Sequence, residues 1–97
     1  MKDKLFVVAT IVAKEEWRSQ LGDALITLVP IAKTEPGFVQ YDLHESIENP
    51  GTFVFYEIWE DEPSLETHNN TPSMKAFGER ISGWVDSVKL EKFKLIS

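Results

Sequence analysis

Two ionisable side chains fall among apolar residues in this 97-residue sequence, and both could carry out proton transfer. His68 lies three residues after Leu65 on a segment of helical character, which places the imidazole beside the core-facing position. Glu57 shares a strand face with Phe55 and Trp59, where an ionised carboxylate is costly unless it has a partner. An imidazole exchanges protons near neutral pH, and burial raises the pKa of a carboxyl group. We therefore expect His68 to be a candidate base, and Glu57 to be either an acid or base or the group that orients His68.

Both side chains also have structural explanations that the sequence leaves open. His68 could be a half-buried histidine that only caps or packs its helix. Glu57 could form a salt bridge with Arg80 or with a lysine of the last strand, or it could lie near the exposed end of its own strand.

A third candidate is Tyr41, which shares a strand face with Val39 and Leu43 and could donate a hydrogen bond to a ligand oxygen. It could equally be a core aromatic residue with a satisfied hydroxyl. A pocket between sheet and helices could be lined by four further residues, which are Trp59, Phe55, Met74 and Phe77. Residues at these spacings also serve as ordinary core. His44 falls on a polar strand face and is expected at the surface or at a dimer interface.

The motifs of this sequence predict no metal site and no cofactor site. The chain has no cysteine, and His44 and His68 lack the close spacing that is typical of zinc sites. A Gly-x-Ser-x-Gly nucleophile motif, a dinucleotide-binding glycine pattern and a P-loop are also absent from the sequence. Catalysis by this chain would therefore depend on a pocket and a base.

The charge distribution excludes several classes of partner. The net charge is −6, and no basic side chain occurs between Lys33 and Lys75, a stretch that holds nine acidic residues. Such a chain is poorly suited to bind nucleic acid or anionic lipid. The longest apolar run, residues 5–9, is too short to span a bilayer, and no signal peptide is recognisable. We expect a cytoplasmic protein that binds neither nucleic acid nor membrane, and the absence of cysteine fits that compartment.

Hydrophobic periodicity predicts a single α+β domain over residues 1–97, with four strands and three helices. The strands are expected at residues 5–13, 37–46, 52–59 and 87–96. The helices are expected at residues 15–32, with a kink at Pro30, at residues 61–69, and from residue 71 onward. The inner face of the last helix would be formed by Met74, Phe77 and Ile81, with Val85 as a further candidate.

This order of elements gives a ferredoxin-like split βαβ sandwich, in which a four-stranded antiparallel sheet carries helices on one face. The strand at 5–13 reads as buried on both faces, and the strand at 52–59 is apolar on both. Since helices would cover only one face, we expect the open face to meet the same face of a second copy in a symmetric homodimer.

Four short motifs follow one another along most of the chain. They are Glu35-Pro36-Gly37 before the strand with Tyr41, then Asn49-Pro50-Gly51-Thr52, then Tyr56-Glu57-Ile58-Trp59, and then His68 with Phe77. In this order and spacing they closely resemble the antibiotic biosynthesis monooxygenase (ABM) domain family. The resemblance implies a dimeric α+β barrel with a cavity between sheet and helices in each subunit. It also implies that the positions shared by the family include Trp59, His68, Glu57 and Tyr41.

Members of that family differ in the reaction they catalyse. Some oxidise aromatic hydroquinones or anthrones without metal or flavin, others open haem, and the autoinducer-2 degradation enzyme isomerises a phosphorylated sugar derivative. The haem-opening branch uses an asparagine on the first strand, where this chain offers only Thr10 as a polar residue. The resemblance therefore argues against haem degradation and favours the quinol monooxygenase and autoinducer-2 degradation branch.

The residues and the resemblance together predict a cofactor-independent monooxygenase that oxidises a small aromatic or quinol substrate with molecular oxygen. His68 would be the base, Tyr41 would donate to the resulting anion, and the aromatic residues would form a dry wall. Two alternatives stay open. The same groups could isomerise a small phosphorylated sugar-like metabolite by proton transfer, or the chain could be a non-catalytic dimer that binds a small ligand.

Overall fold

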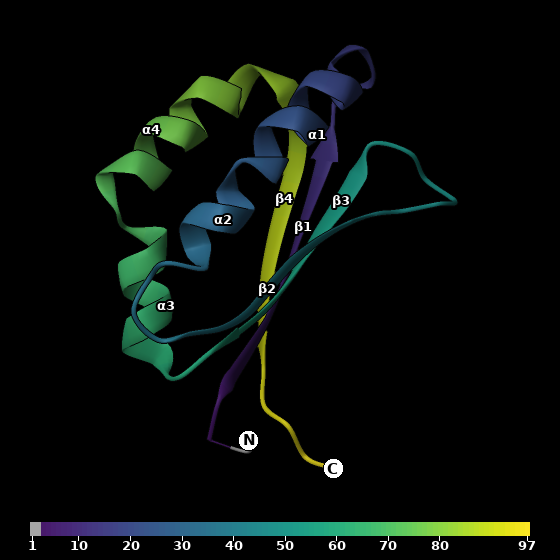
Figure 1. Ribbon diagram of the computed structural model, residues 1–97. Helices are drawn as coiled ribbons and strands as arrows, with labels where there is room; N and C mark the ends of the chain where they lie inside the picture. The colour runs from purple at the N-terminus through teal and green to yellow at the C-terminus, as the bar shows by residue number, and fades with distance from the viewer. Residues whose placement is uncertain (1–2) are drawn as a thin grey trace.

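Four segments rich in apolar and β-branched residues form strands in the computed structural model, which describes residues 3–97 (Figure 1). The strands are β1 (Leu5–Ala13), β2 (Phe38–Glu45), β3 (Thr52–Trp59) and β4 (Val85–Phe93). They pair in the order β2-β3-β1-β4, and every pair is antiparallel. This order places β1 and β3 at the centre of the sheet and β2 and β4 at its edges.

The helices lie in the β1-to-β2 and β3-to-β4 connections, and all of them cover the same face of the sheet (Figure 1). The first connection holds a 3-10 turn (Glu15–Trp17), α1 (Arg18–Ile26) and α2 (Leu28–Ala32). The second holds α3 (Glu62–Asn69), α4 (Pro72–Ile81) and a 3-10 turn (Ser82–Trp84). This arrangement confirms the predicted ferredoxin-like α+β fold. Within residues 3–97, no helix is long and apolar enough to cross a membrane.

Local sequence signals fix where α3 and α4 begin. The carboxylate of Asp61 accepts a hydrogen bond from the backbone N–H of Ser64 at 2.9 Å, and the hydroxyl of Thr71 accepts one from Met74 at 3.1 Å. These N-caps satisfy backbone donors that have no partner inside the helix. The turn before β2 requires Gly37, because its φ is +81° and a Cβ there would lie 2.1 Å from Oγ of Ser64. The start of β2 is therefore pressed against α3.

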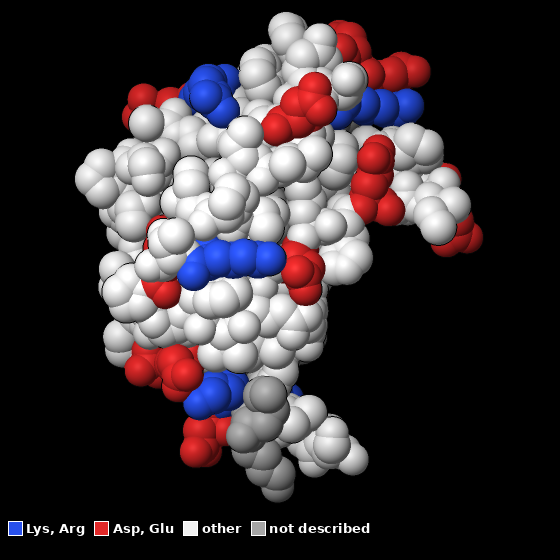
Figure 2. Space-filling view, in the orientation of Figure 1, with Lys and Arg blue, Asp and Glu red and all other residues white. Residues whose placement is uncertain are grey.

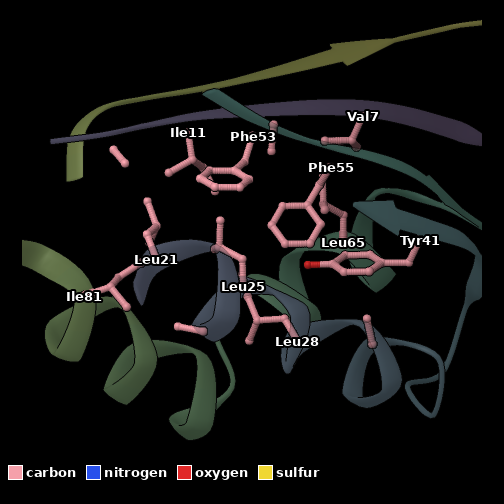
Figure 3. Close-up of a cluster of buried hydrophobic side chains, with 14 of the residues drawn as sticks. Val7, Ile11, Leu21, Leu25, Leu28, Tyr41, Phe53, Phe55, Leu65 and Ile81 are labelled. Atoms are coloured by element: carbon pink, nitrogen blue, oxygen red, sulfur yellow. The ribbon is translucent and has the colours of Figure 1, made fainter. Parts of the chain in front are cut away.

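The hydrophobic core lies between the sheet and the helices, and Figure 3 shows its members pointing towards one another from both layers. On β1 every second side chain from Val7 to Ala13 is buried. Leu21 and Leu25 of α1 are fully buried against this face. Burial of one such leucine contributes roughly 1.5–3 kcal/mol to folding. This gain is made on the face of β1 that carries the buried side chains, and the helices therefore cover that face.

The opposite face of the sheet carries no helix in Figure 1. Half-buried apolar side chains occupy it, namely Phe6, Val8 and Val12 of β1 and Val54 and Tyr56 of β3. In the single chain, β1 is therefore buried on one face and partly exposed on the other, whereas its sequence predicted burial on both. The exposed face of β1 is nevertheless apolar, and only a partner that covers it would bury it as predicted.

The first helical segment is divided at Thr27 instead of being continuous with a kink at Pro30. Pro30 has no N–H to donate to Ile26, the residue four positions before it, so the helical hydrogen-bond ladder cannot continue there. Thr27 closes a tight turn in which its hydroxyl and its backbone N–H both donate to the carbonyl of Ala24, at 2.6 Å and 3.1 Å. The next helix, α2, begins at Leu28.

The last helix ends earlier than its apolar pattern predicted. Val85 begins β4 instead of extending the inner face of α4, and β4 spans residues 85–93 where residues 87–96 were expected. The rings of Trp17 and Trp84 stack with centroids 5.3 Å apart and planes 12° from parallel. This contact holds the end of the helical segment against the start of α1 and directs the chain into the sheet at Val85.

Acidic and basic side chains are interspersed over the surface in Figure 2, where each blue group lies next to red ones. The lysine pairs found in the described residues are Lys4–Glu60, Lys89–Glu91 and Lys92–Glu62. The face in Figure 2 therefore offers a polyanion no continuous basic area, in agreement with the net charge of −6.

Candidate active site

A cluster of polar and aromatic side chains lies where the end of α3 meets β2 and β3. The register pairs Tyr41 of β2 with Glu57 of β3, and Trp59 follows Glu57 on the same face. His68, in the last turn of α3, packs onto these residues from the helical layer. Each of these four residues is at most 3% exposed. The structure thus brings together four residues that the sequence singled out.

The imidazole of His68 is held by two rings and one carboxylate. The Trp59 ring lies 4.7 Å away between centroids, at 33°, and the Tyr41 ring meets it edge-on at 5.3 Å. Nδ1 of His68 contacts Oε1 of Glu35. When Nδ1–H donates to this carboxylate, the neutral ring carries its lone pair on Nε2, so Nε2 is the nitrogen that can accept a proton.

Glu35 is a site residue that sequence reasoning did not identify. It lies between α2 and β2 in the turn with Pro36 and Gly37, and its side chain is 16% exposed. Because Gly37 is pressed against α3, this turn carries the carboxylate to a histidine 33 residues further along the chain. The only signal was an acid directly before a Pro-Gly turn, which reads as a helix stop. Glu35, not Glu57, therefore contacts the imidazole, and this corrects the expectation that Glu57 orients His68.

Glu57 is buried with a hydrogen-bond donor but without a cation. Its Oε1 accepts a hydrogen bond from Nε1 of Trp59 at 2.9 Å. Burial raises the pKa of Glu57; the Trp59 hydrogen bond and the charge of His68 oppose this rise, while Glu35 adds to it. A salt bridge from Glu57 to Arg80 or to a lysine of the last strand is not found among residues 3–97. Lys92 of β4 pairs with Glu62 instead. Glu57 is therefore suited to holding a proton.

Tyr41 is also held in its neutral form. Burial raises the pKa of its hydroxyl above the ordinary value of 10.0, and the negative charges of Glu57 and Glu35 raise it further. Its ring packs against Phe55 with centroids 5.0 Å apart, and Figure 3 shows the hydroxyl directed towards the hydrophobic core between the sheet and the helices. Tyr41 can therefore donate a hydrogen bond but cannot act as a base near neutral pH.

A cavity of about 320 Å³ opens beside this cluster, between α2 and α4. His68 and Glu35 form one part of its wall, and Thr71 and Ser73 add hydroxyl groups. The remaining wall is mainly apolar and includes Leu28, Ile31, Met74, Ala76 and Phe77. Small-molecule sites usually have volumes of about 300–1,000 Å³, so this cavity suits a compact ligand.

The expected pocket residues divide into two groups. Met74 and Phe77 line the cavity, whereas Trp59 and Phe55 do not. Trp59 lies behind the ring of His68, and Phe55 lies against Tyr41, so both belong to the layer that supports the site. This corrects the expectation that they form the pocket wall. Tyr41 is also outside the lining, which removes it as a direct donor to a ligand there.

A second cavity, of about 510 Å³, lies between α1 and the turn that joins β2 to β3. Its lining includes Arg18, Asp23 and His44, and it contains no member of the buried cluster. His44 is therefore separate from His68, as the polar strand face suggested. Although this cavity is larger, the first one is the better candidate for chemistry because it alone borders a buried group that can transfer a proton. Within residues 3–97, no three acidic or histidine side chains are placed to hold a metal ion.

Comparisons with known proteins agree with this fold. The model of the antibiotic biosynthesis monooxygenase family matches residues 4–80, which include all the residues of the cluster. "Putative monooxygenase YcnE" of Bacillus subtilis (strain 168) is 34% identical over 87 residues, which cover 86% of this chain and 92% of that protein.

Solved structures show the same similarity. The crystal structure of PA3566 from Pseudomonas aeruginosa has a TM-score of 0.93 and 30% sequence identity, over 100% of this chain and 98% of that one. A crystal structure of an antibiotic biosynthesis monooxygenase has a TM-score of 0.88 and 26% identity, over 96% of this chain and 99% of that one.

Proposed function

Because the chain belongs to the antibiotic biosynthesis monooxygenase family, we propose that it oxidises a small aromatic hydroquinone with molecular oxygen, without metal or flavin. His68 is the base in this proposal. One observation carries it: a buried imidazole, held at Nδ1 by Glu35, stands in the wall of a cavity that is otherwise mainly apolar.

The reaction begins when Nε2 of His68 removes a phenolic proton from the substrate. Triplet oxygen reacts slowly with closed-shell molecules, but a phenolate is electron-rich enough to pass an electron to it. In the overall reaction one oxygen atom enters the ring and the other leaves as water, so that a hydroquinone becomes a hydroxyquinone. The substrate supplies all the electrons, and no external reductant is needed.

Proton transfer leaves an imidazolium ion next to a substrate anion, and the surrounding residues suit both charges. The carboxylate of Glu35 faces Nδ1 and would stabilise the imidazolium, as the acid does in a catalytic triad. The hydroxyls of Thr71 and Ser73 line the same cavity and would donate to the anion. A substrate that fills the mainly apolar cavity would displace its water, which would strengthen both interactions. Tyr41 and Trp59 would position the His68 ring from behind.

The apolar wall and the dependence of the rate on oxygen separate this proposal from its two alternatives. A phosphorylated sugar would place many hydroxyl groups against the aliphatic and aromatic side chains of α2 and α4, which could not satisfy them. An isomerase would turn over equally well under nitrogen, because its reaction consumes no oxygen. A non-catalytic binding protein would show no turnover in either gas.

The test is oxygen uptake by the purified protein with methylhydroquinone, measured with an oxygen electrode and repeated under nitrogen by product analysis. We expect His68→Ala to lower the rate by about 10²-fold, the usual contribution of a general base. His44→Ala is the matched control, since His44 borders the other cavity, and it should keep the wild-type rate. Equal rates for His68→Ala and the wild type would remove His68 from the mechanism.

We also propose that the chain forms a homodimer through the open face of the sheet. The half-buried apolar residues on that face support this, because a face of this composition is normally covered. Val8→Lys places a charge at its centre and should give a monomer in light scattering. Val88→Lys is the control, since Val88 pairs with Ile11 and so lies on the face of the sheet that the helices cover, and it should leave the dimer intact. A wild-type protein that is monomeric at micromolar concentration would overturn the proposal.

A further inference from the structure

Arg80 is the one cationic side chain that lines the His68 cavity in the described part of the chain, apart from the histidine itself. The acidic group of the lining, Glu35, already faces His68. Arg80 therefore places a positive charge in the cavity wall that no other lining residue neutralises. In a chain of net charge −6, this charge does not belong to a generally basic surface.

The guanidinium of Arg80 is held by an aromatic ring and not by a carboxylate. Its Cζ lies 5.1 Å from the centroid of Phe77, which also lines the cavity. The lysine ion pairs found among residues 3–97 use Lys4, Lys89 and Lys92, the His68 ring contacts Glu35, and Arg80 takes part in none of these contacts. A cation–π contact of this kind uses none of the N–H donors of the guanidinium, so they stay available to a ligand. The planar N–H edge of a guanidinium matches the two oxygens of a carboxylate.

Thr71 and Arg80, which both line the cavity, lie at opposite ends of α4. Thr71, the N-cap of this helix, is three residues from His68, whereas Arg80 is in its last turn. Thr71 and Arg80 are nine positions apart, which corresponds to roughly 13 Å along a helix axis. Met74 and Phe77 line the cavity between them. A ligand that reaches both ends must therefore be elongated, with an apolar middle.

Resting on the proposed function, we propose that the substrate carries a carboxylate on a side arm, and that Arg80 binds this carboxylate while the phenolic hydroxyl faces His68. Arg80 is then the residue that selects acidic substrates over neutral ones. The apolar part of the substrate lies along Met74 and Phe77. The effect of Arg80 on affinity is modest, because the guanidinium is exposed to solvent.

The experiment measures affinity without turnover, by calorimetry under nitrogen. The probes are 4-(2,5-dihydroxyphenyl)butanoate and its primary amide, which differ in charge but share their shape. The wild type should bind the acid about fivefold more tightly than the amide, as an exposed ion pair allows. Arg80→Gln should abolish this preference and leave the affinity for the amide unchanged. Lys75→Gln, an equal change of charge on α4 outside the cavity lining, should keep the preference.

Equal affinities of the wild type for acid and amide, no measurable binding of the acid, or a preference that survives in Arg80→Gln would each overturn the inference. Arg80→Lys tests whether the planar guanidinium matters beyond its charge. It keeps the positive charge but loses the paired N–H donors, so it should keep only part of the preference. Binding is measured without oxygen, so the two proposals can fail separately. An acid preference that depends on Arg80, combined with no oxygen uptake in air, would reject the monooxygenase reaction and retain the carboxylate site.

Discussion

The contact between Glu35 and His68 gives the most direct test of the site. Glu35→Gln keeps the size and a hydrogen-bond acceptor but removes the negative charge that faces Nδ1. If Glu35 stabilises the imidazolium formed during proton transfer, this substitution should lower kcat and leave the affinity for substrate nearly unchanged. Because the Glu35 side chain is only 16% exposed, water screens this charge interaction weakly.

The size of the effect follows from the type of hydrogen bond. A hydrogen bond to a charged group contributes about 1.5–3 kcal/mol, and each ~1.4 kcal/mol changes a rate tenfold. We therefore expect Glu35→Gln to reduce kcat for oxygen uptake by about ten- to hundredfold. The matched control is Glu66→Gln, a loss of the same charge at an exposed position of α3, which should keep the wild-type rate.

A double-mutant cycle distinguishes positioning from an independent role. If Glu35 acts only through His68, then Glu35→Gln should have no effect on the residual rate of His68→Ala. A full ten- to hundredfold loss in the His68→Ala background would show that Glu35 acts on the substrate directly. A Glu35→Gln protein with the wild-type kcat would refute the reasoning that links the contact to catalysis.

Two further predictions concern stability. Burial raises the pKa of Glu57 in the folded protein above the ordinary 4.5, so its contribution to stability is complete below pH 4.5 and is lost as pH rises through the folded pKa. In urea titrations over that pH window, Glu57→Gln should therefore gain stability relative to the wild type. A difference in free energy of unfolding that stays constant with pH would contradict the burial argument. Leu25→Ala should lower the free energy of unfolding by about 2–5 kcal/mol because Leu25 is fully buried, whereas Ile26→Ala, at a position 59% exposed, should cost far less; similar losses in thermal melts would contradict the assigned core face of α1.

The strands and the one-sided helical layer could be predicted because each depends on local patterns. The nearly continuous apolar, β-branched run of residues 5–13 and the aromatic run of residues 52–59 identified β1 and β3 with their observed bounds, and the capping signals at Asp61 and Thr71 located α3 and α4. The break at Thr27 was not predicted, since the apolar stripe runs through it. A stripe records which face is buried, but it does not record where the hydrogen-bond ladder is interrupted.

The site could be predicted only as far as strand faces and helix positions determine it. Tyr41, Glu57 and Trp59 share one face of the sheet, and this follows from alternation and register. The contact of Glu35 with His68 depends on how closely the turn at Gly37 approaches α3, which no local pattern records. The same limit explains the position of Trp59. Its face was predictable, but the placement of the His68 ring between Trp59 and the cavity depends on packing between layers.

The two carboxyl groups beside His68 have different environments, and this difference assigns their roles. Glu57 is 3% exposed and receives a hydrogen bond from Trp59, and its raised pKa favours the protonated form. Glu35 lies in the cavity wall and contacts Nδ1. A site with both groups ionised would hold two negative charges against one imidazolium, and the anion of the substrate would add a third.

Protonation of Glu57, which its burial favours, would remove one of these charges. The imidazolium can then be balanced by Glu35 while the substrate anion forms in the cavity. Glu57→Asp would test this point, because a shorter acid at the same place weakens the hydrogen bond from Trp59 without changing the charge type. We expect a lower free energy of unfolding but the same dependence of kcat on His68. A variant whose oxygen uptake no longer required His68 would show that the carboxyl at position 57 had been a competing base.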